Sequence, residues 1–295
     1  MADTQANTLL FLYAETALHP GTGSSLGIVD LPIQRERTTQ YPTIQSSSIK
    51  GVLRSRSGES GDVTDLLYGP SKQEYAGAIS FSDAKILLFP IRSMAGVFTW
   101  ITCPSVLARL KRDLAMTNQA VDWKLDFVGD TKMEAYLTET TDVIAPNPNN
   151  PVVALEEFLF TPKRNQSVTA IAKWLAENAF PDSDDFSWWR EKVKRGLVIL
   201  NDNDFRDFVT TATEVVARTR LEPTTKKVAS GALWYQEFLP AETLFYSVVV
   251  AQEGRNGKGQ DASKVLIAFK DLKIDRIQIG GDETTGKGFC KLKYL

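Results

Sequence analysis

The chain has 295 residues, 43% of them hydrophobic and 24% charged, a composition that supports a sizeable core and excludes an intrinsically disordered protein. The formal net charge of −2 argues against a free-standing, non-specific nucleic-acid binder. One histidine and two cysteines argue against a zinc site. With no long apolar run and no signal peptide in the sequence, we expect a cytoplasmic protein that contacts no membrane.

Hydrophobic periodicity predicts a mixed series of strands and helices. The expected strands are 7–17, 78–89, 96–103, 152–160, 197–200, 243–251, 274–279 and 289–292. The expected helices begin at about Ser48, with one more turn at 63–68, and continue with 105–116, 166–179, 186–194, 202–212 and 261–269. Their irregular spacing excludes a doubly wound sheet. The sequence therefore predicts a single α+β domain over 1–295, of the ferredoxin-like type, with an inserted helical region at about 140–200.

Two other segments have clear local signatures. Residues 213–240 contain two β-prone arms around Pro-Thr-Thr-Lys-Lys, which is typical of a protruding hairpin. The proline and asparagine residues of 142–150 predict a loop. The side chains of Trp174, Trp188, Trp189 and Cys290 are expected in the core.

The segment 281–288, GDETTGKG, nearly matches the phosphate loop G-x-x-x-x-G-K-[ST] of nucleotide hydrolases. Gly288 stands where that motif needs a hydroxyl for magnesium, and too few residues follow it for the required helix. We therefore expect no nucleotide cofactor. The glycine backbone, together with Lys287, can still approach a phosphate chain closely.

The serine run 46–48 is expected to begin a helix, with its hydroxyls as N-cap candidates. Free backbone N–H groups, the hydroxyls of Ser47 and Ser48, and the cations Lys50 and Arg54 together suit a bound anion. The alternative is a capped surface helix with no ligand.

Asp30 lies in the sequence Gly-Ile-Val-Asp-Leu-Pro and is the third candidate. A carboxylate in such a loop is often a turn former. It could also position a metal ion or a reacting 2′-hydroxyl beside a phosphodiester. The residues alone leave these two interpretations open.

Four motifs in one order, LHPGTGSSLGIVDLPIQRER, SSSIKGVLR, SGALWYQEFLP and IQIGGDETTGKGFCKL, resemble the RAMP-superfamily backbone subunit of type III-B CRISPR (Cmr) effector complexes. The segment ITCPSVLARLKRDL is also similar to that family. The resemblance covers nearly the whole chain. Two departures occur: the family often has Pro-Gly before the serine element, where this chain has Ile44-Gln45, and a common histidine is replaced by Thr38 or Thr39.

The resemblance implies a modified ferredoxin-like (RRM-like) palm that carries a thumb hairpin at about 213–240. It assigns target cleavage to Asp30, which could also hold a divalent ion, Mg or Mn. Glu237, beside the thumb, is a candidate for the general acid. The residues expected to contact RNA are Ser24, Ser25, Ser47, Ser48, Lys50, Arg54, Arg218, Arg220, Gly280, Gly281 and Lys287. The implied partners are the CRISPR guide RNA, single-stranded target RNA, further copies of the chain in a filament and other Cmr subunits.

The expected function is therefore guide-RNA binding combined with cleavage of the paired target RNA at regular intervals. Two alternatives stay open. One is a purely structural RNA-binding subunit. The other is an endoribonuclease that processes the precursor guide, which the single histidine argues against.

Overall fold

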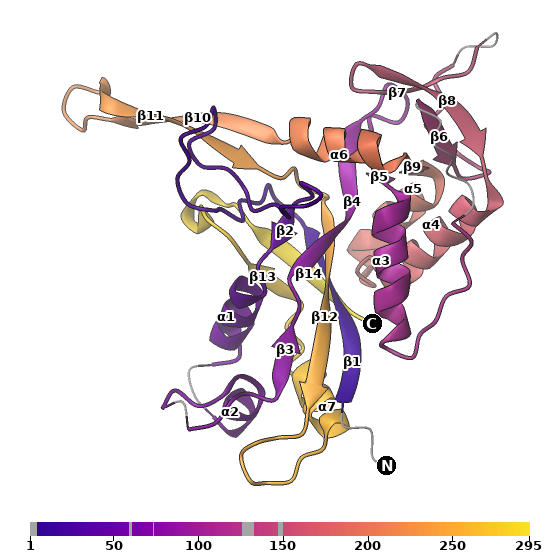
Figure 1. Ribbon diagram of the computed structural model, residues 1–295. Helices are drawn as coiled ribbons and strands as arrows, with labels where there is room; N and C mark the ends of the chain where they lie inside the picture. The colour runs from indigo at the N-terminus through magenta and orange to yellow at the C-terminus, as the bar shows by residue number, and fades with distance from the viewer. Residues whose placement is uncertain (1–4, 59–60, 73, 126–132, 147–149) are drawn as a thin grey trace.

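The computed structural model describes residues 5–58, 61–72, 74–125, 133–146 and 150–295 (Figure 1). Within these ranges, a 12-stranded mixed sheet follows the order β13-β14-β1-β12-β4-β5-β9-β6-β8-β7, with β2 paired to β4 and β3 paired to β12. A separate two-stranded hairpin, β10-β11, projects from it. The α+β class is confirmed.

Four antiparallel strands form the palm, the central part of the sheet. They are β14 (Phe289–Tyr294), β1 (Gln5–Ala14), β12 (Leu244–Gln252) and β4 (Ala84–Arg92). The short strands β2 (Thr43–Ile44), β3 (Ile79–Phe81) and β13 (Arg276–Gln278) extend this region. β1 is buried continuously from Thr8 to Ala14, which is typical of a strand that is covered on both faces.

The sheet continues beyond β4 into a second group of strands. This group consists of β5 (Phe98–Thr102), β9 (Leu197–Ile199), β6 (Glu134–Leu137), β8 (Phe158–Arg164) and β7 (Val153–Leu155). The pairs β5–β9 and β6–β8 are parallel, whereas β6–β9 and β7–β8 are antiparallel.

The helices divide between the two groups of strands (Figure 1). Near the palm lie α1 (Ser46–Arg56), α2 (Asp62–Tyr68) and α7 (Ala262–Asp271). On the other side lie α3 (Pro104–Ala115), α4 (Gln166–Asn178), α5 (Ser187–Gly196) and α6 (Asp202–Thr211). Short 3-10 turns occur at η1 (Asp184–Phe186) and η2 (Glu283–Thr285). In the part of the chain that the structure describes, no helix is long and apolar enough to cross a membrane.

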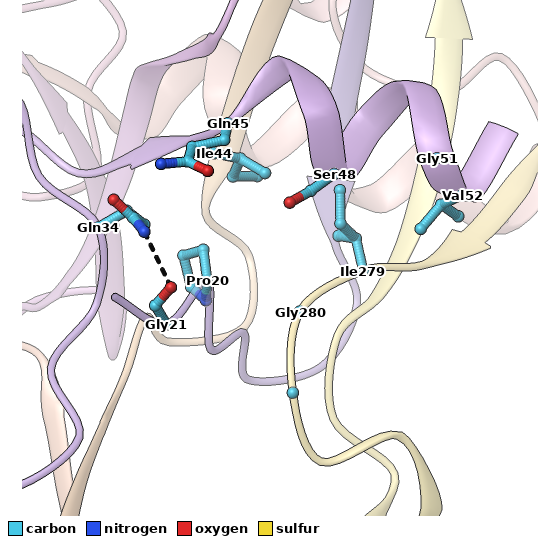
Figure 2. A pocket seen from close by; sticks show the side chains of 11 residues that line it. Pro20, Gly21, Gln34, Ile44, Gln45, Ser48, Gly51, Val52, Ile279 and Gly280 are labelled. Atoms are coloured by element: carbon cyan, nitrogen blue, oxygen red, sulfur yellow. Dashed lines mark hydrogen bonds between the residues drawn. The ribbon is translucent and has the colours of Figure 1, made fainter. Parts of the chain in front are cut away.

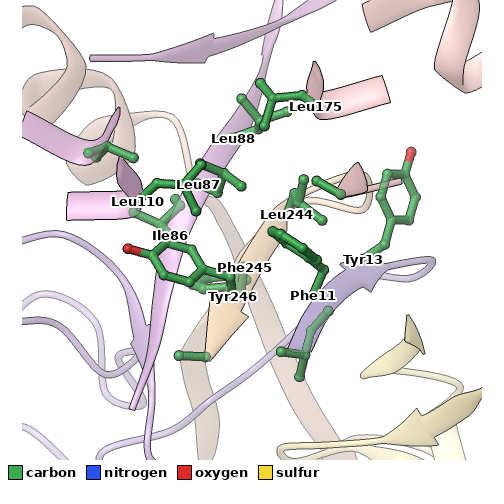
Figure 3. Packing of buried hydrophobic residues seen from close by; sticks show 14 of the residues in the cluster. Phe11, Tyr13, Ile86, Leu87, Leu88, Leu110, Leu175, Leu244, Phe245 and Tyr246 are labelled. Carbon is green, nitrogen blue, oxygen red and sulfur yellow. The ribbon is translucent and has the colours of Figure 1, made fainter. Parts of the chain in front are cut away.

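The core joins the palm to α3 and α4 (Figure 3). Phe11 and Tyr246 lie 6.4 Å apart between ring centroids, and Phe11 also meets Trp174 of α4 edge to face at 6.5 Å. Fully burying one such aromatic side chain contributes about 1.5–3 kcal/mol. The palm is therefore a rigid base for the loops at its edge.

Both cysteines belong to this interior, as expected for Cys290. Burial raises the pKa of each thiol to about 12, so neither is a reactive thiolate near neutral pH. Trp174 and Trp189 also pack against the core. The prediction for Trp188 was wrong, because 58% of this residue is exposed.

The thumb consists of β10 (Glu214–Leu221) and β11 (Val228–Phe238) and extends far from the sheet (Figure 1). The protruding hairpin predicted at 213–240 is confirmed. Large apolar side chains stay exposed along it, among them Leu221, Val228 and Leu233. At its base, Glu237 and Phe238 are buried.

Some predicted elements differ from the structure. The strand expected over 152–160 is the hairpin β7–β8, which turns at Glu156 with a φ of 48°. The strand expected over 78–89 is split into β3 and β4 around Ser82 and Asp83. β6 was not predicted, because its four residues are too few for an alternation of polar and apolar side chains to be recognised. α1 begins two residues before Ser48.

Candidate functional site

A groove of about 460 Å³ lies between α1 and the loop that joins β13 to β14 (Figure 2). It is lined by Pro20, Gly21, Gln34, Ile44, Gln45, Ser48, Gly51, Val52, Ile279, Gly280 and Gly281. The lining contains four glycines and no charged side chain. A bound chain could therefore approach the backbone closely.

The first turn of α1 forms one wall of this groove. Gln45 is the N-cap residue but makes no side-chain capping bond, and the N–H of Ser46 donates instead to Oδ1 of Asp83 at 2.8 Å. The expectation that a serine hydroxyl caps the helix was therefore wrong. The side chains of Ser47 and Ser48 stay exposed, and Ser48 faces the groove.

The basic residues of α1 lie beside the groove lining. Burial lowers the pKa of the Lys50 ammonium, and the nearby Arg54 guanidinium lowers it further. The guanidinium of Arg54 contacts the carbonyl of Tyr68 and the hydroxyl of Ser71, both at 3.5 Å. An anion near Lys50 would oppose both effects and favour its charged form. The helix presents positive charge next to a neutral groove.

The opposite wall is the glycine loop, residues 280–288. Gly280 has a φ of 85°, and a Cβ placed there would lie 2.4 Å from the carbonyl oxygen of His19. The N–H of Gly281 donates to that same oxygen at 3.0 Å. Glycine is required at position 280 because both the backbone conformation and the close approach exclude a side chain. Lys287 lies over the ring of Phe238, 5.1 Å from its centroid.

His19 follows β1 in the chain and connects the palm to the base of the thumb. Its ring is buried, donates from Nδ1 to the carbonyl of Glu237 at 2.6 Å, and lies 5.5 Å from the ring of Phe238. The backbone carbonyl of His19 accepts the hydrogen bond from the N–H of Gly281 and so holds the glycine loop. His19 therefore connects three segments of the site.

Asp30 lies in a loop held against β11. The N–H of Tyr235 donates to Oδ2 of Asp30 at 2.7 Å. The next residue, Leu31, pairs with β11 through its N–H to Tyr235 at 3.1 Å and its carbonyl to Glu237 at 3.0 Å. Among the described residues, no hydrogen bond reaches Oδ1 of Asp30, and the residue is partly exposed. One carboxylate oxygen is thus fixed and the other is available.

Ser24 and Ser25 belong to the Asp30 loop and not to the groove lining. The N–H of Ser25 donates to the carbonyl of Asp30 at 2.8 Å, and its hydroxyl accepts from the N–H of Gly27 at 3.0 Å. Leu26 and Ile28 in the same loop are almost fully exposed. Ser25 therefore shapes the loop, while two apolar side chains project from it.

Glu237 is buried, with 6% of the residue exposed, and its carboxylate is fully engaged. Oε1 accepts from Arg35 at 2.6 Å and from Thr213 at 2.8 Å, and Oε2 accepts from the N–H of Ile33 at 3.0 Å. This arrangement does not support the predicted catalytic role, because no oxygen is free to exchange a proton with substrate. It indicates a residue that fixes the thumb base and the segment that follows Asp30.

Arg218 and Arg220 differ in their surroundings although both lie on β10. Nη2 of Arg218 lies 3.5 Å from Oδ1 of Asp282, and the guanidinium lies over Phe238 at 5.3 Å. Arg220 is exposed near the end of the strand. Of the two predicted RNA contacts, only Arg220 has an open position, because Arg218 is committed to the glycine loop.

The RAMP superfamily model matches residues 11–291. This chain belongs to the RAMP superfamily. It is similar to the "CRISPR system Cmr endoribonuclease Cmr4" of Pyrococcus furiosus, with 38% identity over 295 residues that cover 96% of this chain and 94% of the relative. The crystal structure of oligomeric Cmr4 from P. furiosus matches with a TM-score of 0.73 and 31% identity, covering 99% and 98% of the two chains.

A chain of the cryo-EM structure of the type III-B Cmr-beta bound to cognate target RNA has the same fold, with a TM-score of 0.77 at 23% identity over 99% of this RAMP chain and 98% of that chain. The resemblance recognised in the sequence is thus confirmed.

The sequence identified only part of the RAMP site. Of the predicted residues, Ser48, Gly280 and Gly281 line the groove, with Ser47, Lys50 and Arg54 on the same helix. Gln34 and Gln45 were missed, although both line the groove, and so was Asp83, which caps α1. Gln45 and Asp83 lie outside the family motifs, and nothing in the first motif singles out Gln34. The fold brings the three residues together from the loop before β2, the position after β2 and the position before β4.

Proposed function

We propose that this RAMP protein binds a CRISPR guide RNA as a repeated backbone subunit of a type III-B Cmr complex and cleaves the target RNA paired to that guide. The observation that carries the proposal is the attachment of the Asp30 carboxylate to β11, the strand that also borders the glycine loop. The Asp30 carboxylate and the glycine loop that borders the groove are thus both hydrogen-bonded to β11. The "endoribonuclease" name of the P. furiosus relative supports the same activity.

We infer that the palm is ferredoxin-like (RRM-like). The strand order β14-β1-β12-β4 is that of a split β-α-β unit, with α1 between β1 and β4 and α7 between β12 and β14. In this arrangement, the loops after β1 and β13 meet at one edge of the sheet. The groove lies at that edge, next to α1.

Guide binding would use the groove for the RNA backbone and the adjacent cations for its phosphates. A monomer with a net charge of −2 gains little affinity alone, but each copy that neutralises a few phosphates releases counterions. Several copies on one guide would add their contributions through a high effective concentration. Sequence would be read by guide–target pairing and not by the protein.

Cleavage would use the 2′-hydroxyl of a target nucleotide that the thumb displaces from stacking. The 2′-oxygen attacks the adjacent phosphorus, the bond to the 5′-oxygen breaks, and Asp30 orients the hydroxyl or accepts its proton through Oδ1. The hydrogen bond from Tyr235 keeps the carboxylate in one orientation. Leu26 and Ile28, exposed in the same loop, would contact the displaced target strand.

A divalent ion, Mg or Mn, is part of the proposal. Among the described residues, no group of three His, Cys, Asp or Glu side chains could hold a metal ion. A single carboxylate still fits, because Mg²⁺ is often bound through one or two carboxylates and completed by water and substrate phosphates. Asp30 would supply that carboxylate, and a bound ion would neutralise charge on the phosphate.

The test is Asp30→Asn in a complex reconstituted with guide and target RNA. Guide and target binding should stay within about two-fold of the wild type, while the single-turnover cleavage rate falls on the order of 100-fold or more, as for loss of a general base. Glu191→Gln, which removes one exposed charge from α5, is the matched control and should cleave normally. Chelation of divalent ions should abolish cleavage by the wild type.

Two outcomes would contradict the proposal. Cleavage that persists in Asp30→Asn would exclude the catalytic role of Asp30. A wild-type complex that binds guide and target but never cuts would favour the purely structural RNA-binding subunit. The carboxylate of Glu237 also favours that alternative, because both of its oxygens already accept hydrogen bonds. Precursor processing is disfavoured because the single histidine is buried and hydrogen-bonded, and incubation with a repeat hairpin would test it.

A further inference from the structure

The glycine loop contains an acid where a phosphate-binding loop would favour none. Asp282 lies two residues after Gly280 and takes a left-handed conformation, with φ 65° and ψ 30°. This left-handed backbone conformation favours glycine over a residue with a side chain. Both the charge and the backbone conformation of Asp282 therefore oppose a simple role in phosphate binding.

The side chain of Asp282 points to the thumb base instead. Nε2 of Gln236 donates to its Oδ2 at 2.5 Å, and Arg218 lies 3.5 Å from its Oδ1. Gln236 is buried, with 5% exposed, and the Nε group of Arg218 is buried with no hydrogen-bond partner among the residues that the structure describes. We call these three side chains, Arg218, Gln236 and Asp282, the latch.

The latch is connected to Asp30 through the backbone of β11. Gln236 lies between Tyr235, whose N–H holds the Asp30 carboxylate, and Glu237, whose N–H holds the carbonyl of Leu31. Leu31 and Gln236 also form a parallel β-bridge. A shift of Gln236 would therefore move the N–H group that orients Asp30.

We propose that Asp282 is a positioning residue that couples the occupied guide groove to the orientation of Asp30 through Gln236 and Arg218. This inference rests on the function proposed above. A guide phosphate seated on Gly280 and Gly281 would fix the loop backbone next to Asp282. The loop would then hold Gln236, and Gln236 would hold the strand segment that orients the target-facing carboxylate.

The latch can be distinguished from a purely electrostatic role of Asp282, because the two predict different effects of Asp282→Asn on guide binding and cleavage. If Asp282 only repels RNA, then Asp282→Asn should tighten guide binding and leave cleavage unchanged or faster. If the latch positions Asp30, the same variant should keep or improve guide binding while cleavage slows about ten-fold or more, because the acceptor of the Gln236 hydrogen bond and the partner of Arg218 loses its charge. Cleavage thus falls although guide binding does not.

The experiment measures guide affinity and single-turnover target cleavage in the reconstituted complex. The variants are Asp282→Asn, Gln236→Glu and the double variant that carries both. Gln236→Glu places two carboxylates together and should also slow cleavage about ten-fold or more. The double variant exchanges donor and acceptor, restores the hydrogen bond and the net charge, and should recover cleavage to within about three-fold of wild type.

The charge control is Glu253→Gln, because this exposed side chain follows β12 and lies outside both the glycine loop and the groove lining. It should cleave normally. Normal cleavage by Asp282→Asn, or a double variant no better than the single variants, would overturn the latch. Loss of guide binding together with cleavage in Asp282→Asn would also overturn it. A wild-type complex that does not cut would instead refute the proposed function.

Discussion

At the scale of single residues, the site depends on how differently three acids are placed. Asp30 has one fixed oxygen and one available oxygen, Glu237 has both oxygens engaged in a buried position, and Asp282 joins the glycine loop to the thumb base. The sequence could propose Asp30 because it lies in a motif. It could not assign Glu237 or Asp282, because their roles depend on partners that are distant in the chain.

The pairing of Glu237 with Arg35 leads to a prediction about stability. Glu237→Ala leaves the guanidinium of Arg35 and the N–H of Ile33 without their acceptor in a buried place. Breaking such a pair costs about 3–5 kcal/mol in the free energy of unfolding, measurable by urea denaturation. Glu177→Ala on the exposed side of α4 should cost about 0.5 kcal/mol or less. An equally small effect of Glu237→Ala would argue against the fixing role.

At the scale of elements, the thumb and α1 were predicted well because each has a strong local signal. The hairpin follows from its β-prone arms and turn residues, and α1 follows from its apolar and basic spacing. The start of α1 was predicted less well, because the cap comes from Asp83, nearly forty residues away in the chain. Short strands such as β6 depend on pairing with distant partners, β8 and β9, and the sequence alone could not place them.

The tip of the thumb offers a prediction about phosphate contacts. Arg220, Lys226 and Lys227 are exposed there, whereas Arg218 is committed to the latch. Replacing the three exposed cations with alanine should weaken guide binding and lower the slope of log affinity against log salt by about 2, for three single-strand phosphates. The measurement is a salt titration of guide affinity.

A matched variant replaces Lys163, Lys173 and Lys264, three exposed lysines outside the thumb and the groove lining. It loses the same charge but should keep the wild-type salt slope. If both triple variants change the slope equally, the effect comes from the overall charge and not from contacts made by the thumb.

At the scale of the whole molecule, the palm core supports two functional faces. In the proposed function, the groove between α1 and the glycine loop binds the guide, and the loop that carries Asp30 acts on the target beside the projecting thumb. The resemblance of ordered motifs predicted the α+β class, and it is also the source of this proposed division. The joint between the two faces, formed by His19 and residues 235–237, could not be predicted because only the folded chain brings these residues into contact.

The most direct test of the account is whether RNA of discrete length co-purifies with the protein and depends on the groove. Ser48→Glu introduces a carboxylate into the groove at the first turn of α1, where the helix dipole tolerates negative charge. Ser55→Glu places the same charge on the exposed part of α1 outside the groove lining. The account predicts one short RNA species with the wild type and Ser55→Glu, and at least about a ten-fold loss of it with Ser48→Glu, because a carboxylate beside the RNA phosphates repels them. Equal RNA with both variants, or no RNA with the wild type, would contradict it.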